Sequence, residues 1–316
     1  MAKLRTFLTV LLLSVLASTT LTTTASAGTA SAGTTPAGTT PAGTTPAGTT
    51  PAGTAPAESA PSSGWNNWSC RPSTAHPEPV VLVHGMGANH WDNFLTLAPT
   101  LRANGYCVYS QTYGKTLLGG LVGGLAPMAD SAAELSTFVD RVRAATGASK
   151  VDIVGHSEGT TVPAYYMKHL GGAAKVDDFV GFGSNFKGTT LNGLATLAEA
   201  LKLQGLLTGV GCGACTDYLP GSAFLAELND GPVAVPGPTY TSIVTRYDTV
   251  VTPYTSGLLA PAPNVTNIVL QDKCGLDFAG HLGLAIDPNV AQLVLNRLDP
   301  EGSKPFRCRL FTTLGI

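Results

Sequence analysis

The chain has 316 residues, with 18 Lys and Arg against 20 Asp and Glu, and its formal net charge is −2. It contains neither a basic run nor a basic patch interleaved with aromatic residues, which argues against a nucleic-acid partner. Six cysteines, the first of them Cys70, fit an exported protein with three disulfide bonds.

Residues 1–27 have the pattern of a secretory signal peptide. Lys3 and Arg5 supply positive charge, and the apolar core Phe7–Ala17 is too short to span a bilayer. Ala25-Ser26-Ala27 matches the A-x-A cleavage pattern, so we expect cleavage after Ala27 and a secreted, extracellular protein. The alternative is an uncleaved anchor, although no stop-transfer pattern follows.

Residues 28–63 are dominated by a repeat. The unit Thr-Thr-Pro-Ala-Gly recurs from Thr34 to Gly53 without a large apolar residue, and the first charge comes at Glu58. Such a segment cannot bury enough surface to offset its chain entropy, and its regular prolines favour an extended geometry. We expect a disordered spacer, or a tail with no function of its own. Globular patterning begins near Gly64, and we place one folded domain over 64–316.

The domain alternates strand and helix patterns. Short apolar runs predict strands at Pro79–Val83, Tyr106–Tyr113, Lys150–Val154, Val176–Gly183, Tyr240–Arg246 and Val265–Leu270. Helical spacing of apolar residues predicts helices from Trp91 to near Gly105, over Leu135–Val142 with a stop at Gly147, over Thr160–Leu170 and over Asn289–Leu298. This alternation predicts an α/β fold with a mostly parallel central sheet flanked by helices.

Gly155-His156-Ser157-Glu158-Gly159 lies between a predicted strand and a predicted helix. Strand, G-x-S-x-G and helix in this order form the nucleophile elbow of α/β-hydrolases, where a sharp turn exposes the Ser hydroxyl. The pentapeptide alone is weak evidence in a glycine-rich chain, so the strand before it and the partners after it must support it. Ser157 is the predicted nucleophile.

A serine nucleophile needs a base, and the base needs a carboxylate that fixes its tautomer. In this fold the order along the chain is Ser, acid, His. The histidines beyond Ser157 are His169, inside a predicted helix, and His281, in a glycine-flanked loop after the last strand, so His281 is the predicted base. Asp248, just past a strand end, is the predicted acid. The competing carboxylates are Asp217, Asp230, Asp272 and Asp277, of which we interpret the last two as solvated loop residues.

The tetrahedral intermediate of acyl transfer needs two hydrogen-bond donors at its oxyanion. The backbone amide of Glu158, directly after the nucleophile, is one. We assign the other to the amide of Met86, in the glycine-rich loop after the first predicted strand. His84, in the same loop, is interpreted as a brace for this oxyanion loop and not as a catalytic residue.

Four sequence blocks resemble one known family when taken together. They are Val81–Gly87, Lys150–Ser157, Tyr240–Asp248 and Ala279–Leu284, and the resemblance covers most of Pro79–Pro300. The chain resembles the small secreted class 2 triacylglycerol lipases of bacteria, both the minimal Bacillus lipases and, more closely, the longer actinobacterial members. The resemblance implies an α/β-hydrolase fold, hydrolysis of carboxylic esters without a metal or cofactor, and the roles assigned above.

The chain also departs from the minimal lipases. Glu158 and Thr160 stand where those lipases often carry Met and Gly, and a carboxylate beside the nucleophile bears on the local field and the pH optimum. Lys187–Pro238 is much longer than in the minimal members. Within it, Leu191–Leu207 has leucines at helical spacing, which fits either a lid or an ordinary core helix. Leu117–Met128, a glycine-rich apolar stretch, is predicted to be a mobile loop, and both stretches are candidates for acyl-binding walls.

For the six cysteines we favour the pairs Cys70–Cys107, Cys212–Cys215 and Cys274–Cys308, with exchange among the last four as the main alternative. Cys212-x-x-Cys215 also suggests zinc or redox chemistry, but neither a second such pair nor a nearby histidine accompanies it, so we expect no metal site.

Other functions stay open at this point. The same triad would serve acyl transfer or polyester hydrolysis, and the spacer would equally tether a non-catalytic domain at a cell surface. The favoured prediction is a monomeric lipase that acts on lipid or other ester substrates.

Overall fold

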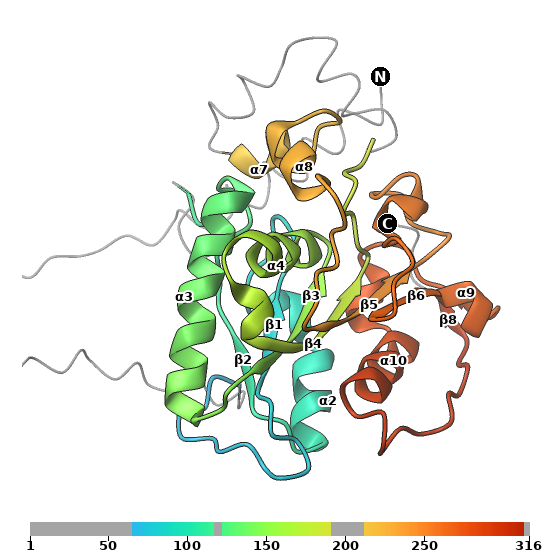
Figure 1. Cartoon of the computed structure of the whole chain (residues 1–316). Helices are drawn as coiled ribbons and strands as arrows, with labels where there is room; N and C mark the ends of the chain where they lie inside the picture. The colour runs from blue at the N-terminus through green and yellow to red at the C-terminus, as the bar shows by residue number, and fades with distance from the viewer. Residues whose placement is uncertain (1–64, 117–121, 191–211, 313–316) are drawn as a thin grey trace, which may run out of the picture. The chain divides into compact units, whose positions relative to one another are not determined.

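The structure is a computed structural model that describes residues 65–116, 122–190 and 212–312 (Figure 1). The predicted signal peptide and spacer, the stretch 117–121 and the predicted lid or core helix Leu191–Leu207 lie outside these described residues.

Six parallel strands form the central sheet, in the order β2-β1-β3-β4-β5-β6. The strands are β1 (Val80–Val83), β2 (Val108–Ser110), β3 (Val151–His156), β4 (Val176–Phe182), β5 (Thr239–Val244) and β6 (Val265–Val269). Parallel neighbours require a crossover connection, and helices supply most of these crossovers. The predicted α/β class is therefore confirmed.

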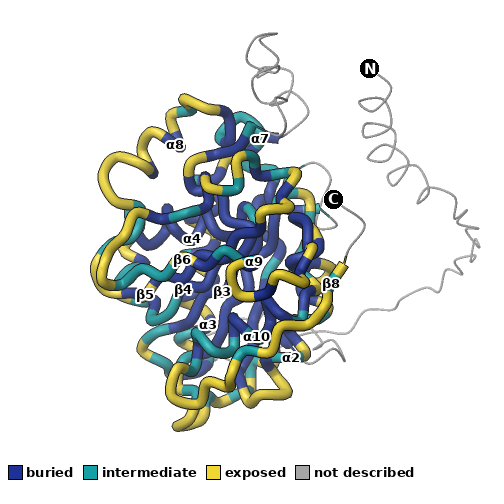
Figure 2. The backbone as a smooth tube through the Cα atoms, turned by 90° about the vertical axis from the view of Figure 1, so that its right-hand side faces the viewer, coloured by how far each residue is buried: buried dark blue, intermediate teal, exposed yellow. Residues whose placement is uncertain are grey.

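Helices cover both faces of this sheet (Figure 1). On one face lie α3 (Met128–Thr146) and α4 (Glu158–His169), and on the other lie α2 (Leu97–Ala103) and α10 (Pro288–Leu298). Because the sheet is covered on both faces, β1 and β3 are buried over their full length, and most of the sheet is dark blue in Figure 2. The edge strand β6 is mostly half-buried.

Strand β1 shows how one short run serves both layers. Successive side chains of a strand point to opposite faces. Val81 and Val83 pack in the core with α3 and α4, whereas Val80 and Leu82 pack in the core with α2 and α10. All four residues are buried, so β1 is held from both sides at the strand that leads into the predicted oxyanion loop.

Shorter elements complete the described chain. They are η1 (Asp92–Phe94), η2 (Gly172–Ala174), α7 (Gly213–Asp217), α8 (Ala223–Leu228), η3 (Tyr254–Gly257), α9 (Leu270–Lys273), β7 (Asp277–Phe278), η4 (Gly283–Ile286) and β8 (Phe311–Thr312). Strands β7 and β8 pair as a small second sheet.

Several predicted elements differ in their bounds. Helix α3 begins at Met128, ahead of the helix expected over Leu135–Val142, and two further differences have a local cause. The helix expected from Trp91 is divided into the 3-10 turn η1 and the helix α2, which begins at Leu97. Pro99 lacks an N–H and fits only the first turn of a helix, so a continuous helix through it would lose a hydrogen bond. The strand expected over Tyr106–Tyr113 pairs only at Val108–Ser110, because the chain then leaves the sheet edge and Tyr113 bonds to the loop after β1.

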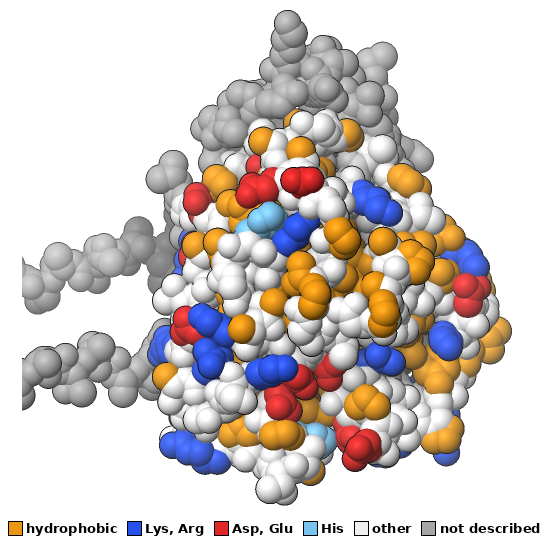
Figure 3. All heavy atoms as spheres, in the orientation of Figure 1, with side chains coloured by type: hydrophobic (Ala, Val, Ile, Leu, Met, Phe, Trp, Pro, Cys, Tyr) orange, Lys and Arg blue, Asp and Glu red, His pale blue; other side chains and the backbone are white. Residues whose placement is uncertain are grey.

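The structure places the six cysteines at bonding distance in the favoured pairs, Cys70–Cys107, Cys212–Cys215 and Cys274–Cys308. In this bonded form Cys212 and Cys215 offer no thiolate to a metal. No helix within the described ranges has the length and apolar character needed to cross a membrane. On the face drawn in Figure 3, Lys and Arg side chains lie among Asp and Glu and do not form a patch of one sign.

Candidate active site

The predicted site residues lie in loops at the carboxyl ends of four strands. Met86 follows β1, Ser157 follows β3 and Asp248 follows β5. His281 lies beyond β6, after α9 and the short strand β7. In the sheet, β1 has β2 on one side and β3 on the other, so the chain reverses its strand order between β1 and β3. Ligands bind in open α/β sheets at such a switch point, outside the carboxyl ends of the strands.

The turn at Ser157 has the strained backbone of a nucleophile elbow. Ser157 has φ 55° and ψ −123°, a conformation that side-chain-bearing residues rarely adopt. A Cβ at Gly155 would lie 1.8 Å from the Gly159 carbonyl oxygen, and a Cβ at Gly159 would lie 1.9 Å from the Val83 carbonyl oxygen. Both glycines are therefore required by close backbone approach, as the G-x-S-x-G pattern predicts.

Three residues from separate loops form one hydrogen-bonded chain. His281 Nε2 lies 2.8 Å from Ser157 Oγ, and His281 Nδ1 lies 2.8 Å from Asp248 Oδ2. Asp248 Oδ1 accepts from the amides of Val250 (2.9 Å) and Val251 (2.6 Å). The side chains of His281 and Asp248 are each 3% exposed, while Ser157 is half-buried. The structure thus brings the three predicted residues together.

The competing residues lie elsewhere or have other partners. Asp217 accepts from the Met128 amide, Asp272 pairs with Arg246 at the surface, and Asp230 is exposed. His169 lies at the end of α4, 3.8 Å from Glu227.

Asp277 is not the solvated loop carboxylate that the sequence suggested, because it is fully buried. Its oxygens accept from the Ala279 amide and from Asn289 Nδ2. Asp287 lies beside it and caps α10 by accepting from the Asn289 amide. Burial and the Asp277 neighbour raise the pKa of Asp287 to about 8. Asp277 and Asp287 lie before and after the loop that carries His281. The sequence around Asp277 does not indicate that its carboxylate is buried.

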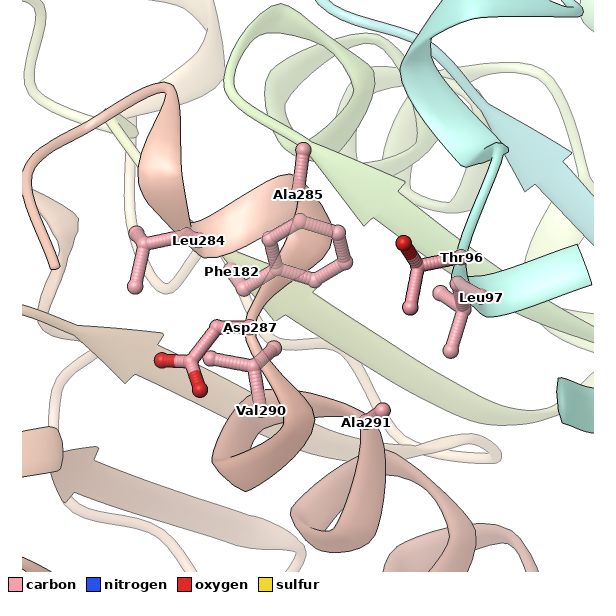
Figure 4. A pocket seen from close by; sticks show the side chains of 8 residues that line it. All are labelled: Thr96, Leu97, Phe182, Leu284, Ala285, Asp287, Val290 and Ala291. Atoms are coloured by element: carbon pink, nitrogen blue, oxygen red, sulfur yellow. The ribbon is translucent and has the colours of Figure 1, made fainter. Parts of the chain in front are cut away.

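A narrow pocket lies between that loop and α2 (Figure 4). Leu284 and Ala285 of η4 line it on one side, and Thr96 and Leu97 line it on the other. It has no room for a water molecule, so it is a packing defect and not a substrate site.

The loop after β1 is fixed by side chains that the sequence analysis missed. Asn93 Oδ1 accepts from the Gly85 amide at 2.7 Å, and Asn93 Nδ2 lies 3.0 Å from His156 Nδ1. His156 Nε2 lies 3.1 Å from the His281 carbonyl oxygen, which only accepts, so Nε2 carries the hydrogen and Nδ1 accepts from Asn93. One network therefore joins the loop of Met86 to the backbone of His281.

His84 is buried in the same region, consistent with its interpretation as a brace. Its Nδ1 donates to the Gly85 carbonyl at 2.8 Å, its Nε2 accepts from the Tyr113 amide at 3.3 Å, and its ring stacks on that of Tyr113. Desolvation lowers the pKa of His84 to about 4 and that of His156 to about 3, so both rings are neutral at pH 7.

Backbone hydrogen bonds join the predicted oxyanion loop to the segment at Gly123. The Gly87 amide donates to the Gly123 carbonyl, and the Gly123 amide donates to the Ala88 carbonyl. The amide of Met86 has no acceptor in the part of the chain that the structure describes. The amide of Glu158 opens α4, where the first N–H groups have no partner within the helix. Both predicted oxyanion donors are thus free to bind an anion.

The described residues include one carboxylate cluster with metal-ligand spacing, formed by Asp152, Asp177 and Asp178. It lies at the amino ends of β3 and β4, the edge of the sheet opposite to Ser157. Asp152 accepts from the Asp178 amide and Asp177 pairs with Lys150, so these carboxylates have protein partners.

The sheet, the elbow and the three-residue chain at the strand ends define an α/β-hydrolase. Among solved structures, Aspergillus fumigatus lipase B is similar to this chain at a TM-score of 0.57 and 18% identity, covering 73% of this chain and 53% of that one. The chain thus spans about half the length of that lipase. Bacillus licheniformis lipase BlEst2 in its mature form has a TM-score of 0.54 and 18% identity, covering 72% of this chain and 94% of that one. At these identities the likeness shows the fold.

The family follows from the sequence model of class 2 lipases, which matches residues 77–293. Because the match spans more than half of the chain, the protein belongs to the class 2 lipase family.

Proposed function

We propose that this protein is a serine carboxylic-ester hydrolase that cleaves fatty-acid esters such as acylglycerols. The observation that carries the proposal is the hydrogen-bonded chain from Ser157 Oγ through His281 to Asp248 at the carboxyl edge of the sheet. A hydroxyl within reach of an imidazole, itself oriented by a buried carboxylate, is the arrangement that activates serine for acyl transfer.

In the proposed reaction Ser157 Oγ attacks the ester carbonyl carbon while His281 Nε2 takes the hydroxyl proton. Asp248 holds the imidazole by its Nδ1 hydrogen and stabilises the imidazolium that forms. The carbonyl oxygen becomes an oxyanion, which the free amides of Met86 and Glu158 stabilise. His281 then gives its proton to the leaving alcohol oxygen as the ester bond breaks. Water repeats the sequence on the acyl-enzyme and releases the fatty acid.

Exposed apolar side chains support a fatty acyl substrate. Leu282 and Ile286, on the loop after His281, are 56% and 46% exposed, and Trp91 and Leu95, after the oxyanion loop, are 51% and 48% exposed. Trp91 and Leu95 flank the turn η1, Leu282 precedes η4 and Ile286 ends it, and the two turns pack against each other. Large exposed apolar groups gathered in one region mark surfaces that meet apolar partners.

The remaining assignments belong to the same proposal. A signal peptide over 1–27, a spacer over 28–63 and a monomeric domain over 64–316 describe a secreted lipase, and three disulfides suit an oxidising compartment. Acyl transfer or polyester hydrolysis on the same triad, and a non-catalytic surface protein, are the alternatives.

The test is hydrolysis of p-nitrophenyl esters of increasing acyl length by the chain from Gly28, exported to an oxidising compartment, beside Ser157→Ala. We expect release that rises toward long chains, and a loss of at least about 10⁴-fold in kcat/KM for the variant with an unchanged melting curve. Activity confined to short chains would make the protein an esterase. A folded protein that neither cleaves an ester nor reacts with a fluorophosphonate would support the hypothesis of a non-catalytic surface protein.

A further inference from the structure

A hydrogen bond outside the three-residue chain joins the acid loop, residues 245–248, to the base loop, residues 277–281. Thr245 Oγ1 donates to the Ala279 carbonyl oxygen at 2.7 Å, and Ala279 lies two residues before His281. The two loops are therefore connected twice, once by the side chains of the proposed acid and base and once by Thr245.

The hydroxyl group of Thr245 has every hydrogen-bonding position filled. Besides donating its one hydrogen to Ala279, its oxygen accepts from the Tyr247 amide at 3.2 Å and from Gln271 Nε2 at 2.9 Å. A hydroxyl has one hydrogen and two lone pairs, so this group has no capacity left. Because Thr245 is fully buried, loss of its hydroxyl would take a hydrogen-bond partner from three protein groups at once.

Gln271 extends this contact with its side-chain amide. Its Nε2 also donates to the Asp277 carbonyl oxygen in the base loop at 3.2 Å. Its Oε1 accepts from the Arg246 amide in the acid loop at 2.8 Å. The amide group of Gln271 therefore holds both loops, and the Thr245 hydroxyl is bonded to it.

The sheet brings Thr245 and Gln271 together although they are 26 residues apart in the chain. Strands β5 and β6 are parallel neighbours, and Val244 at the end of β5 pairs with Val269 at the end of β6. The chain leaves the sheet after each of these residues, and α9 begins at Leu270. Gln271 therefore lies in the first turn of α9, beside the point at which the acid loop begins.

We propose that Thr245 and Gln271 are positioning residues: they join the acid loop to the base loop and so fix the proposed acid relative to the proposed base. The inference rests on the proposed function. Both residues act through His281, whose ring must reach Ser157 Oγ and Asp248 at the same time. A displacement of the base loop by about 1 Å would disturb both of these bonds, and a misplacement of that size costs about 100-fold in rate.

The first measurement is steady-state kinetics on a p-nitrophenyl ester with Thr245→Val, Thr245→Ser and Gln271→Leu. Val removes the hydroxyl and Leu removes the amide, so we expect kcat to fall about 10- to 100-fold with little change in KM. Ser retains the hydroxyl, and we expect it to keep most of the parental kcat. A Thr245→Val variant with the parental kcat would overturn the proposal, as would a Thr245→Ser variant that is as slow as Thr245→Val.

Two control variants remove the same kinds of hydrogen bond elsewhere. Thr146→Val removes a buried hydroxyl that donates to a carbonyl and accepts from an amide at the end of α3. Gln292→Leu removes a side-chain amide of α10 that donates to the Pro305 carbonyl and accepts from the Arg307 amide. Because these bonds hold neither the acid loop nor the base loop, we expect the parental kcat in both controls. An equal fall of kcat in the controls would overturn the positioning role.

A second readout reports on the bond between Asp248 and His281 without any ester. With ¹⁵N-labelled histidine, the hydrogen on His281 Nδ1 should give a ring N–H signal far downfield, because the ring is buried and donates to a carboxylate. The loss of this signal in His281→Gln assigns it. We expect the signal to move upfield in Thr245→Val and Gln271→Leu and to keep its position in both controls. A lower stability alone would not move it in a folded protein.

The two readouts separate this inference from the proposed function. If no ester is cleaved but the signal moves as expected, the ester hydrolase is refuted and the coupling of the two loops stands. If the parent cleaves esters and Thr245→Val has the parental kcat and signal position, the positioning role alone is refuted. Should Thr245→Val not fold, Gln271→Leu decides in the same way, and a parental kcat and signal position in that variant would overturn the proposal.

Discussion

The two sides of the site satisfy their polar groups differently. On the base side, the Asp248 carboxylate accepts from two backbone amides and from His281, and the buried Asp277 accepts from two donors. On the oxyanion side, neither the Met86 amide nor the Glu158 carboxyl group has a hydrogen-bond partner within the described ranges. The proposed base is held in place before a substrate arrives, whereas the proposed oxyanion donors are held by their neighbours and have no partner themselves. That difference is what the proposed reaction requires, because the charge they stabilise exists only in the transition state.

The largest effect on kcat should come from a change at Asp248, on the base side of the site. Asp248→Asn keeps the shape of the side chain but presents an amide hydrogen to His281 or a weaker acceptor, which disturbs the tautomer that lets Nε2 take the Ser157 proton. We expect kcat to fall by about 10⁴-fold with KM changed little. Steady-state kinetics on a p-nitrophenyl ester measure this. A variant within tenfold of the parent would show that another carboxylate serves His281.

A smaller effect on kcat should follow when the hydrogen bonds of Asn93, which hold the loop of Met86, are removed. Asn93→Ala removes the acceptor for the Gly85 amide and the donor to His156, which frees the loop of Met86. We expect kcat to fall about 10- to 100-fold. Asn93→Asp is the matched comparison: it keeps the acceptor for Gly85 and loses the donor to His156. If only the Ala variant is slow, the bond to Gly85 is the one that matters, and equal rates for both variants and the parent would contradict the network.

The smallest effect concerns stability on the base side. The pKa of Asp287 is raised from its ordinary value of 3.8 to about 8, so the folded state binds a proton that the unfolded chain releases. Folding stability from this group is present below pH 4 and is lost as the pH rises toward 8. Asp287→Asn cannot ionise and retains a good N-cap for α10. Between pH 5 and pH 8 its free energy of unfolding should therefore fall less than that of the parent, by at least about 1 kcal/mol. Urea unfolding at both pH values measures the difference, and parallel losses would contradict the raised pKa.

The sequence by itself determined the fold class and the family, and it predicted the order of the proposed site residues along the chain. Short apolar runs that alternate with segments of helical spacing predict a parallel sheet covered by helices. Gly155 and Gly159 predict a tight turn in which no larger residue fits. Bounds were less predictable where one residue decides, as Pro99 does at the start of α2.

Only the tertiary structure decided which polar side chains are buried and whom they face. Asn93 and Tyr113 look like ordinary loop residues in the sequence, because they have partners far along the chain, as His156 is 63 residues from Asn93 and His84 is 29 residues from Tyr113. From the sequence alone Glu158 looks like a charge beside the nucleophile, but its side chain is fully buried and has no hydrogen-bond partner among the described residues. Local patterns specify backbone shape, whereas burial and hydrogen-bond partners depend on contacts between distant segments, which exist only in the folded chain.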